Sequence, residues 1–263
     1  MTRIARFEHD GSIRHAIVEN DDTLRLIEGD ILGDWSPTDE TVPLGQVRLL
    51  APVDPPNIIA IGLNYRKHAE ESGMAIPERP VIFFKTTTAL SNPGDPIMLP
   101  RMAPDEVDYE CELVIIIGRQ AKHVPPEKAL EYVLGYTCGN DVSARDCQNR
   151  LDVQWARAKS FDTFAPMGPW LETDLDPDNV RVTTRLNGEV MQDSNSNDLI
   201  FSCRELISYL SANMTLLPGT AIMTGTPSGV GFARKPPVFL RANDTVEIEI
   251  EGIGVLSNPV LAE

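Results

Sequence analysis

The chain has few aromatic residues, a minority of basic ones and no long apolar run. Aromatic residues make up 6% of the 263 positions, and 23 Lys and Arg stand against 39 Asp and Glu, for a formal net charge of −16. Such an acidic surface disfavours nucleic acids and anionic membranes as partners. No apolar run approaches the roughly 18 residues of a membrane helix, and the first residues lack the apolar core of a signal peptide. We therefore expect a cytoplasmic protein.

Cysteine is also scarce. Cys111, Cys138, Cys147 and Cys203 are scattered along the chain without a C-x-x-C pair. This spacing disfavours a disulfide framework and a cysteine-based zinc site. The share of hydrophobic residues is ordinary at 42%. The length suits one large domain with a small appendage.

Short strand patterns dominate the first 50 residues. Asp10-Gly11 between two runs predicts a hairpin, whereas residues 35–43 predict an acidic loop. Prolines at positions 52, 55 and 56 predict a stiff connector. We expect a domain boundary near residue 53, which separates a small N-terminal β domain (1–53) from a large domain (54–263).

The rest of the chain also favours strands over helices. Apolar runs begin at Ile58 and Val81, and Asn187-Gly188 predicts a second hairpin. Residues 203–216 predict an amphipathic helix. Because helices do not alternate regularly with strands, a Rossmann or TIM-barrel arrangement is disfavoured, and we expect a mostly-β or α+β fold.

The stretch VDYECELVIII (residues 107–117) places carboxylates beside an apolar run. Asp108, Glu110 and Glu112 alternate with other residues, so they would share one face of a strand. Near the C-terminus, VEIEIE (246–251) has the same alternation, and there we expect solvated glutamates. Uncompensated carboxylates in the first stretch would be costly, and a divalent cation would compensate them. Asp108 is a spare ligand on the same face, but for this residue we favour a solvated place at the strand entry.

A hard cation needs oxygen ligands from several segments. Asp141 follows an apolar run and is the best third ligand, with a helix N-cap as the alternative role. Three carboxylates favour Mg²⁺ or Mn²⁺ over zinc, and Ca²⁺ also fits this donor set. Arg145 would follow Asp141 by one helical turn and bind a substrate carboxylate as a fork, with Gln148 three residues further. The alternative for Arg145 is an ion pair on the surface of a helix, with Asp146 or a neighbouring residue.

A possible acid–base group lies in GLNYRKHAEESG. His68 and Glu71 would share one face of a short helix, where the carboxylate orients the imidazole as a general base. Gly62 and Gly73 would let this segment move as a lid. An incidental surface pair is the alternative. Lys159, expected in a loop, would neutralise a substrate carboxylate or an enolate, or else be solvated.

The glycine-rich stretch TGTPSGVG (224–231) is similar to a phosphate loop only superficially, because it lacks the GK[ST] ending. Its backbone N–H groups and the Thr226 hydroxyl could still face an anion. The alternative is a tight connection between strands.

Six stretches together resemble the fumarylacetoacetate hydrolase family, over roughly residues 56–260. They occur in the family's order, and they are GLNYRKHAEESG, DYECELVIIIGR, GYTCGNDVSARDCQ, AKSFDTFAPMGPW, LNGEVMQDSNSNDLIF and TGTPSGVG. The resemblance implies a mixed β-sandwich roll, usually a homodimer, with a small N-terminal domain.

The resemblance also implies roles for nine side chains. It implies a divalent metal held by Glu110, Glu112 and Asp141. It implies a lid-borne catalytic pair, His68 and Glu71, and a catalytic lysine at Lys159. By the same likeness, the substrate pocket is lined by Arg145, Gln148 and Thr226.

The implied substrate is a small 2-oxo or 2,4-dioxo acid. The sequence is similar to the short branch of acylpyruvate hydrolases, oxaloacetate decarboxylases and hydroxyhepta-dienedioate isomerases. We expect hydrolytic carbon–carbon cleavage of an acylpyruvate-type substrate through a metal-stabilised enolate. Decarboxylation of oxaloacetate, isomerisation and hydrolysis of sugar-derived diketo acids use the same site. A non-catalytic binding module with a structural metal is the alternative of another class. Residues such as Met74, Ile76, Phe164 and Met167 would shape the pocket for the substrate's tail.

Overall fold

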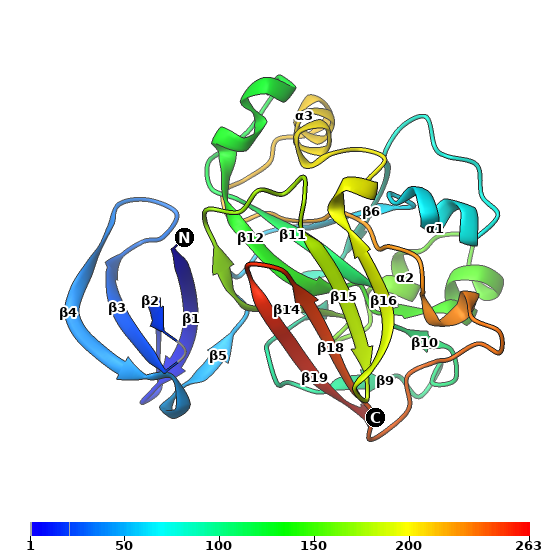
Figure 1. Cartoon of the computed structure of the whole chain (residues 1–263), viewed down its shortest axis with the longest axis horizontal. Helices are drawn as coiled ribbons and strands as arrows, with labels where there is room; N and C mark the ends of the chain where they lie inside the picture. The colour runs from blue at the N-terminus through cyan, green and yellow to red at the C-terminus, as the bar shows by residue number, and fades with distance from the viewer. Residues whose placement is uncertain (1, 21) are drawn as a thin grey trace.

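The computed structural model describes residues 2–20 and 22–263, which are built mostly from strands (Figure 1). The expected mostly-β fold is confirmed. The helices are α1 (Arg66–Glu71), α2 (Ala156–Lys159) and α3 (Cys203–Asn213). A π-helical segment covers Cys147–Leu151, and short 3₁₀ segments cover Leu44–Gln46, Thr87–Ala89, Pro126–Tyr132, Ser196–Asp198 and Gly231–Ala233.

The first strands form a small unit beside the main body (Figure 1). These strands are β1 (Arg3–His9), β2 (Ser12–Asn20), β3 (Thr23–Gly29), β4 (Trp35–Pro43) and β5 (Arg48–Leu50). The Asp10-Gly11 turn joins β1 and β2 with positive φ at both residues, as the hairpin pattern predicts. The unit has a hydrophobic cluster of its own, around Phe7 and Leu24. The predicted boundary near residue 53 follows β5 and stays a prediction.

The acidic loop that we expect over residues 35–43 is wrong, because this segment is strand β4 paired antiparallel with β3. The strand β4 lies at the outer end of the large sheet, and no other strand of the described residues pairs with its outer edge. Proline lacks an N–H and is tolerated on such an edge. The prolines therefore do not prevent strand formation here.

The large sheet continues from β1 into the main body. Beyond β1 its order is β14 (Ala165–Glu172), β12 (Val133–Asn140), β11 (Cys111–Ile117), β17 (Ala221–Met223), β6 (Ile58–Gly62) and β7 (Val81–Lys85), with β8 (Leu90–Ser91) on β14. All seven residues of β11 are buried, so the apolar run is a central strand as predicted.

A second sheet packs against the large one and makes the sandwich. Its order is β16 (Glu189–Asn195), β15 (Arg181–Leu186), β18 (Thr245–Ile250), β19 (Gly254–Ala262) and β9 (Ile97–Leu99). Strands β11 and β12 contact β18, whose apolar residues are buried while its glutamates are partly exposed. The pairs β6–β17 and β9–β19 are parallel, so the sheets are mixed as expected.

Two further sequence patterns form the elements that they predict. The Asn187-Gly188 turn joins β15 and β16 with φ of 53° and 83°. Helix α3 has a capping box from Ser202 and Glu205, and it buries its apolar face. No helix of the described part of the chain is long and apolar enough to cross a membrane. The four cysteines are all buried and free.

Strand β11 generates a stability prediction. Ile115 is fully buried and pairs with Tyr136 on one side and Ile222 on the other. We expect Ile115→Ala to lower the free energy of unfolding by about 2–5 kcal/mol, because a cavity forms in a rigid central strand. Val255→Ala, at a position 44% exposed, is the matched control and should change it by under about 1 kcal/mol. Urea denaturation measures both. Equal losses would show that β11 is not central to stability.

Candidate functional site

Three buried carboxylates meet where two paired strands end. Glu110 and Glu112 lie at the start of β11, and Asp141 directly follows β12, its antiparallel partner. The Asp141 N–H donates to the Glu110 carbonyl at 2.9 Å. One ligand atom from each carboxylate lies within 4.8 Å of the others. Because the two strand ends are paired, Asp141 is held beside two glutamates that lie far from it in the sequence.

Two buried lysines and an arginine contact this cluster. Lys159 Nζ lies 2.8 Å from Glu110 Oε2 and 2.7 Å from Asp141 Oδ2. Lys85, at the end of β7, forms an ion pair with Asp141 Oδ1 and donates to the Val142 carbonyl at 3.2 Å. Arg145 forms an ion pair with Glu110 Oε1 at 2.7 Å.

Glu112 is the exception in the cluster. Among residues 2–20 and 22–263, no basic side chain forms an ion pair with it. Its Oε2 accepts a hydrogen bond from the Gly225 N–H at 2.8 Å. Burial, followed by the charges of Asp141 and Glu110, raises the pKa of Glu112 well above its usual range. An all-oxygen donor set with such an uncompensated carboxylate fits a hard divalent cation such as Mg²⁺ or Mn²⁺.

The charges of the neighbours move the other pKa values. Burial alone would raise the pKa of Glu110, but Lys159 and Arg145 outweigh it, so the pKa is low. Burial would lower the pKa of Lys159, and Asp141 and Glu110 reverse this and raise it. For Lys85 burial prevails and lowers the pKa. Lys159 is therefore the lysine more firmly held as an ammonium.

His68 and Glu71 lie on α1, as their spacing predicts. His68 is buried, and its Nδ1 is 3.2 Å from Glu71 Oε2. Because a carboxylate only accepts, Nδ1 carries the hydrogen, and Nε2 of the neutral ring keeps a lone pair. Both carboxylate oxygens of Glu71 also accept from the Gly229 N–H, Oε1 at 2.9 Å and Oε2 at 3.1 Å. This second contact ties the short helix to the glycine-rich stretch.

Asp108 is not solvated, so that expectation is wrong. It is fully buried on the separate strand β10 (Val107–Asp108), which pairs with β13 (Ser143–Ala144). Its carboxylate accepts from Arg145 Nε at 2.9 Å and from the N–H groups of Gly231 at 2.7 Å and Phe232 at 3.0 Å. These donors replace water, and Asp108 holds Arg145 rather than a metal.

The route from Asp141 to Arg145 also differs from expectation. The chain between them includes β13, so it does not make a helical turn. Arg145 is buried, donates to Gln148 Oε1 at 2.7 Å and pairs with Asp108 and Glu110 instead of Asp146. Lys159 is the last residue of α2 rather than part of a loop.

Most of these side chains line one cavity of about 170 Å³. It is lined by His68, Glu110, Glu112, Asp141, Arg145, Gln148, Lys159 and Thr226, together with Met74, Phe83, Trp155 and Phe232. Of the expected tail-shaping residues, Met74 lines it, whereas Phe164 and Met167 are buried in the core away from its lining. Ile76 is exposed and does not line it either. Phe232 lies under Arg145, with 4.7 Å from the guanidinium carbon to the ring centre.

The glycine-rich stretch does present N–H groups to anions, and these anions are the protein's own carboxylates. Gly225 donates to Glu112, Gly229 to Glu71 and Gly231 to Asp108. Positive φ at Gly225 and Gly229, 106° and 101°, is a conformation that other residues rarely adopt. The glycines thus position three separate parts of the site.

Sequence reasoning missed Lys85, Asp108's true role and the aromatic lining. A lysine inside the apolar stretch VIFFK is the signal that could have pointed to Lys85, since a lysine is rarely buried without a partner. Trp155 packs edge-on against Phe83, at 5.5 Å between ring centres. No spacing in the sequence predicts that contact.

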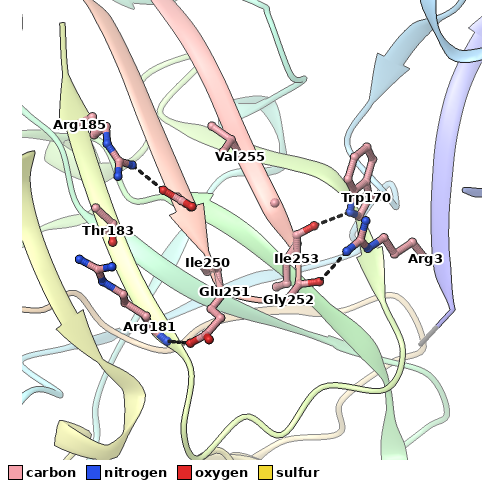
Figure 2. A pocket seen from close by; sticks show the side chains of 12 residues that line it. Arg3, Trp170, Arg181, Thr183, Arg185, Ile250, Glu251, Gly252, Ile253 and Val255 are labelled. Atoms are coloured by element: carbon pink, nitrogen blue, oxygen red, sulfur yellow. Dashed lines mark hydrogen bonds and ion pairs between the residues drawn. The ribbon is translucent and has the colours of Figure 1, made fainter. Parts of the chain in front are cut away.

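A larger cavity, of about 630 Å³, lies elsewhere, against the second sheet (Figure 2). Its basic side chains already have partners. Arg181 forms two 2.7 Å hydrogen bonds with Asp193, Arg185 pairs with Glu249, and Arg3 reaches the Gly252 carbonyl at 3.5 Å. Size alone therefore does not make it the reactive site, and the clustered charges favour the smaller cavity.

Two family models match the chain. Residues 57–261 match "Fumarylacetoacetate (FAA) hydrolase C-terminal", and residues 2–52 match "Rv2993c-like, N-terminal". A rat protein named "Oxaloacetate tautomerase Fahd2a, mitochondrial" is 45% identical, over 84% of this chain and 71% of that protein.

Solved structures are similar to this chain over nearly its whole length. A 5-carboxymethyl-2-hydroxymuconate delta-isomerase from Mycobacterium smegmatis has a TM-score of 0.90 at 45% identity, covering 99% of this chain and 100% of that chain. A fumarylacetoacetate hydrolase from Exiguobacterium antarcticum has a TM-score of 0.91 at 38% identity, with 100% of both chains covered. The sandwich, the carboxylate cluster and these matches place the chain in the fumarylacetoacetate hydrolase family.

Proposed function

We propose that the protein is a divalent-metal-dependent enzyme that moves a proton within a small 2-oxo acid, with keto–enol tautomerisation of oxaloacetate as the reaction to test first. The observation that carries the proposal is the shared cavity: a carboxylate-oriented imidazole and a charged lysine line it together with three carboxylates. Similar proteins named tautomerase and isomerase support proton transfer over hydrolysis as the first candidate.

Glu110, Glu112 and Asp141 would hold the ion, Mg²⁺ or Mn²⁺ first and Ca²⁺ as a third candidate. A bound divalent cation polarises a 2-oxo group and makes the neighbouring C3 hydrogens more acidic. The homodimer implied by the family resemblance and the cytoplasmic location stay predictions.

The base in this scheme is Nε2 of His68. It takes the proton from C3 and returns it to the 2-oxygen, so the composition of the substrate does not change. Glu71 stabilises the imidazolium between these two steps through the Nδ1 hydrogen bond. Lys159 uses two of its three N–H donors on Glu110 and Asp141, and the third can bond the oxygen on which negative charge develops.

Arg145, Gln148 and Thr226 would bind the carboxylates of the substrate. Arg145 donates from Nε to Asp108 and from Nη1 to Gln148, and its Nη2 forms an ion pair with Glu110 at 2.7 Å. Because three partners hold the guanidinium, its planar fork is already oriented. This suits a small dianion better than a neutral substrate.

Hydrolytic cleavage of an acylpyruvate is the second candidate, supported by the similar structure named fumarylacetoacetate hydrolase. The same His68 nitrogen would then take a proton from water. The resulting hydroxide adds to the 4-oxo carbon, the C3–C4 bond breaks, and C3 keeps the electron pair until it is protonated. Decarboxylation of oxaloacetate would need no attacking water.

The metal proposal predicts dependence on the carboxylates. We expect EDTA to abolish turnover and Mg²⁺ or Mn²⁺ to restore it. Glu112→Gln should weaken Mn²⁺ binding by at least roughly tenfold, since even an outer partner of a metal ligand contributes that much. Isothermal titration measures it. The control Glu247→Gln, on the partly exposed side of β18, should bind as the wild type does. Full turnover after EDTA treatment would refute the metal requirement.

The base assignment predicts a specific loss in His68→Asn. We expect turnover of oxaloacetate, followed by the ultraviolet absorbance of its enol, to fall by roughly 10²–10⁴-fold. Mn²⁺ affinity should be retained, because His68 is not among the carboxylate ligands. His9→Asn, at a surface position of β1, should keep full turnover. Unchanged rates in His68→Asn would remove His68 from the mechanism.

The three candidate reactions, tautomerisation, hydrolysis and decarboxylation, differ in their products. We expect the enol and keto forms of oxaloacetate to interconvert faster with the enzyme, without release of pyruvate. Pyruvate from acetylpyruvate or fumarylpyruvate without CO₂ would instead establish the hydrolase. Pyruvate with CO₂ from oxaloacetate would establish the decarboxylase. Chromatography of the products, with CO₂ recorded in parallel, distinguishes them.

A further inference from the structure

Gln192 is a buried amide that touches the edge of the site without lining it. It lies on β16, is 1% exposed, and uses both ends of its side chain. Its Oε1 accepts from the Cys111 N–H at 2.9 Å and from the Thr184 hydroxyl at 2.7 Å. Its Nε2 donates to the Thr226 hydroxyl at 2.8 Å and to the Pro227 carbonyl at 2.9 Å.

Two backbone groups fix which way this amide points. The Cys111 N–H can only donate, so it must face the oxygen. The Pro227 carbonyl can only accept, so it must face the nitrogen. In a flipped amide, the nitrogen would face the Cys111 N–H, donor against donor, and the oxygen would face the Pro227 carbonyl, acceptor against acceptor. The nitrogen therefore faces Thr226.

The orientation of the Gln192 amide determines the hydrogen-bonding role of the Thr226 hydroxyl. Because Nε2 donates to it, its oxygen acts as an acceptor in that contact, and its own hydrogen is not used there. Within the described residues, no hydrogen bond has this hydroxyl as the donor. Thr226 lines the reactive cavity. Its hydrogen is thus available to an acceptor inside the cavity.

We propose that Gln192 is a positioning residue that sets the Thr226 hydroxyl as a hydrogen-bond donor to a carboxylate oxygen of the substrate. The inference rests on the proposed 2-oxo acid substrate, because the carboxylate of such a substrate supplies the acceptor for this hydroxyl. Cys111 lies between Glu110 and Glu112, so the same amide also ties the hydroxyl to the strand that carries two of the three carboxylates. Gln192 would act through Thr226 and would not touch the reacting atoms.

The test is a double-mutant cycle in which the affinity for oxalate is measured. Oxalate is a planar dianion that presents oxygens as a 2-oxo acid does, and its affinity for the Mn²⁺-loaded protein can be titrated without turnover. We expect Gln192→Met and Thr226→Val each to weaken oxalate binding by about tenfold, the size of one hydrogen bond to a charged group. The double variant should also lose about tenfold, because both changes remove the same bond.

Matched variants separate positioning from structural support. Thr226→Ser keeps the hydroxyl and should bind oxalate within about threefold of the wild type. Thr184→Val removes a hydrogen bond of Gln192 on the side away from the cavity, and the backbone groups still hold the amide, so oxalate affinity should be unchanged. Gln192→Glu keeps the shape but replaces the donor by an acceptor, and we expect the same loss as in Gln192→Met.

Different results would overturn the proposal. A hundredfold loss in the double variant would show independent effects, and a parallel loss of Mn²⁺ affinity in Gln192→Met would show a merely structural role. Wild-type oxalate affinity in Gln192→Glu would also refute it, even where Gln192→Met fails to fold. Absence of oxalate binding by the wild type would refute it as well. Normal oxalate binding without any turnover of oxo acids would refute only the proposed reaction.

Discussion

The site depends on the burial of carboxylates at the adjacent ends of β11 and β12. A buried charge is costly unless it is paired and hydrogen-bonded. The surrounding elements supply the cations for these ion pairs: β7 ends in Lys85, α2 ends in Lys159, and the residue after β13 is Arg145. Of the three carboxylates in the cluster, Glu112 is the one without a cationic ion-pair partner among the described residues. The architecture therefore combines a nearly neutralised cluster with one carboxylate suited to a metal ion.

The glycine-rich stretch connects the parts of this site. Its N–H groups donate to Glu112, Glu71 and Asp108, so strand β11, helix α1 and the carboxylate that holds Arg145 share one support. Such contacts need close approach of the backbone, which a side chain at Gly231 would block: a Cβ there would lie 1.9 Å from the Val238 carbonyl oxygen. The same stretch carries Thr226, which Gln192 holds from the second sheet.

Much of the fold follows from local patterns. The turns at Asp10-Gly11 and Asn187-Gly188, the amphipathic helix α3 and the buried run of β11 are all where their patterns predict them. The His68–Glu71 pair forms because residues three apart meet on one helix face. The loop expected over β4 is wrong because an edge strand tolerates proline, and edge position is not visible in local sequence.

The sequence by itself determined the strand-rich fold class and the candidate carboxylates and dyad, because these depend on short-range periodicity and on recognisable motifs. Tertiary structure decided which side chains neutralise one another. Lys85 reaches Asp141 across 56 positions, and Asp108 reaches Arg145 across 37. Such pairings depend on strand order and register, which place distant residues side by side. The sequence pattern around Asp108 is the same whether its carboxylate is solvated or buried. Only the hydrogen-bond donors that other strands and loops bring to it allow the buried position.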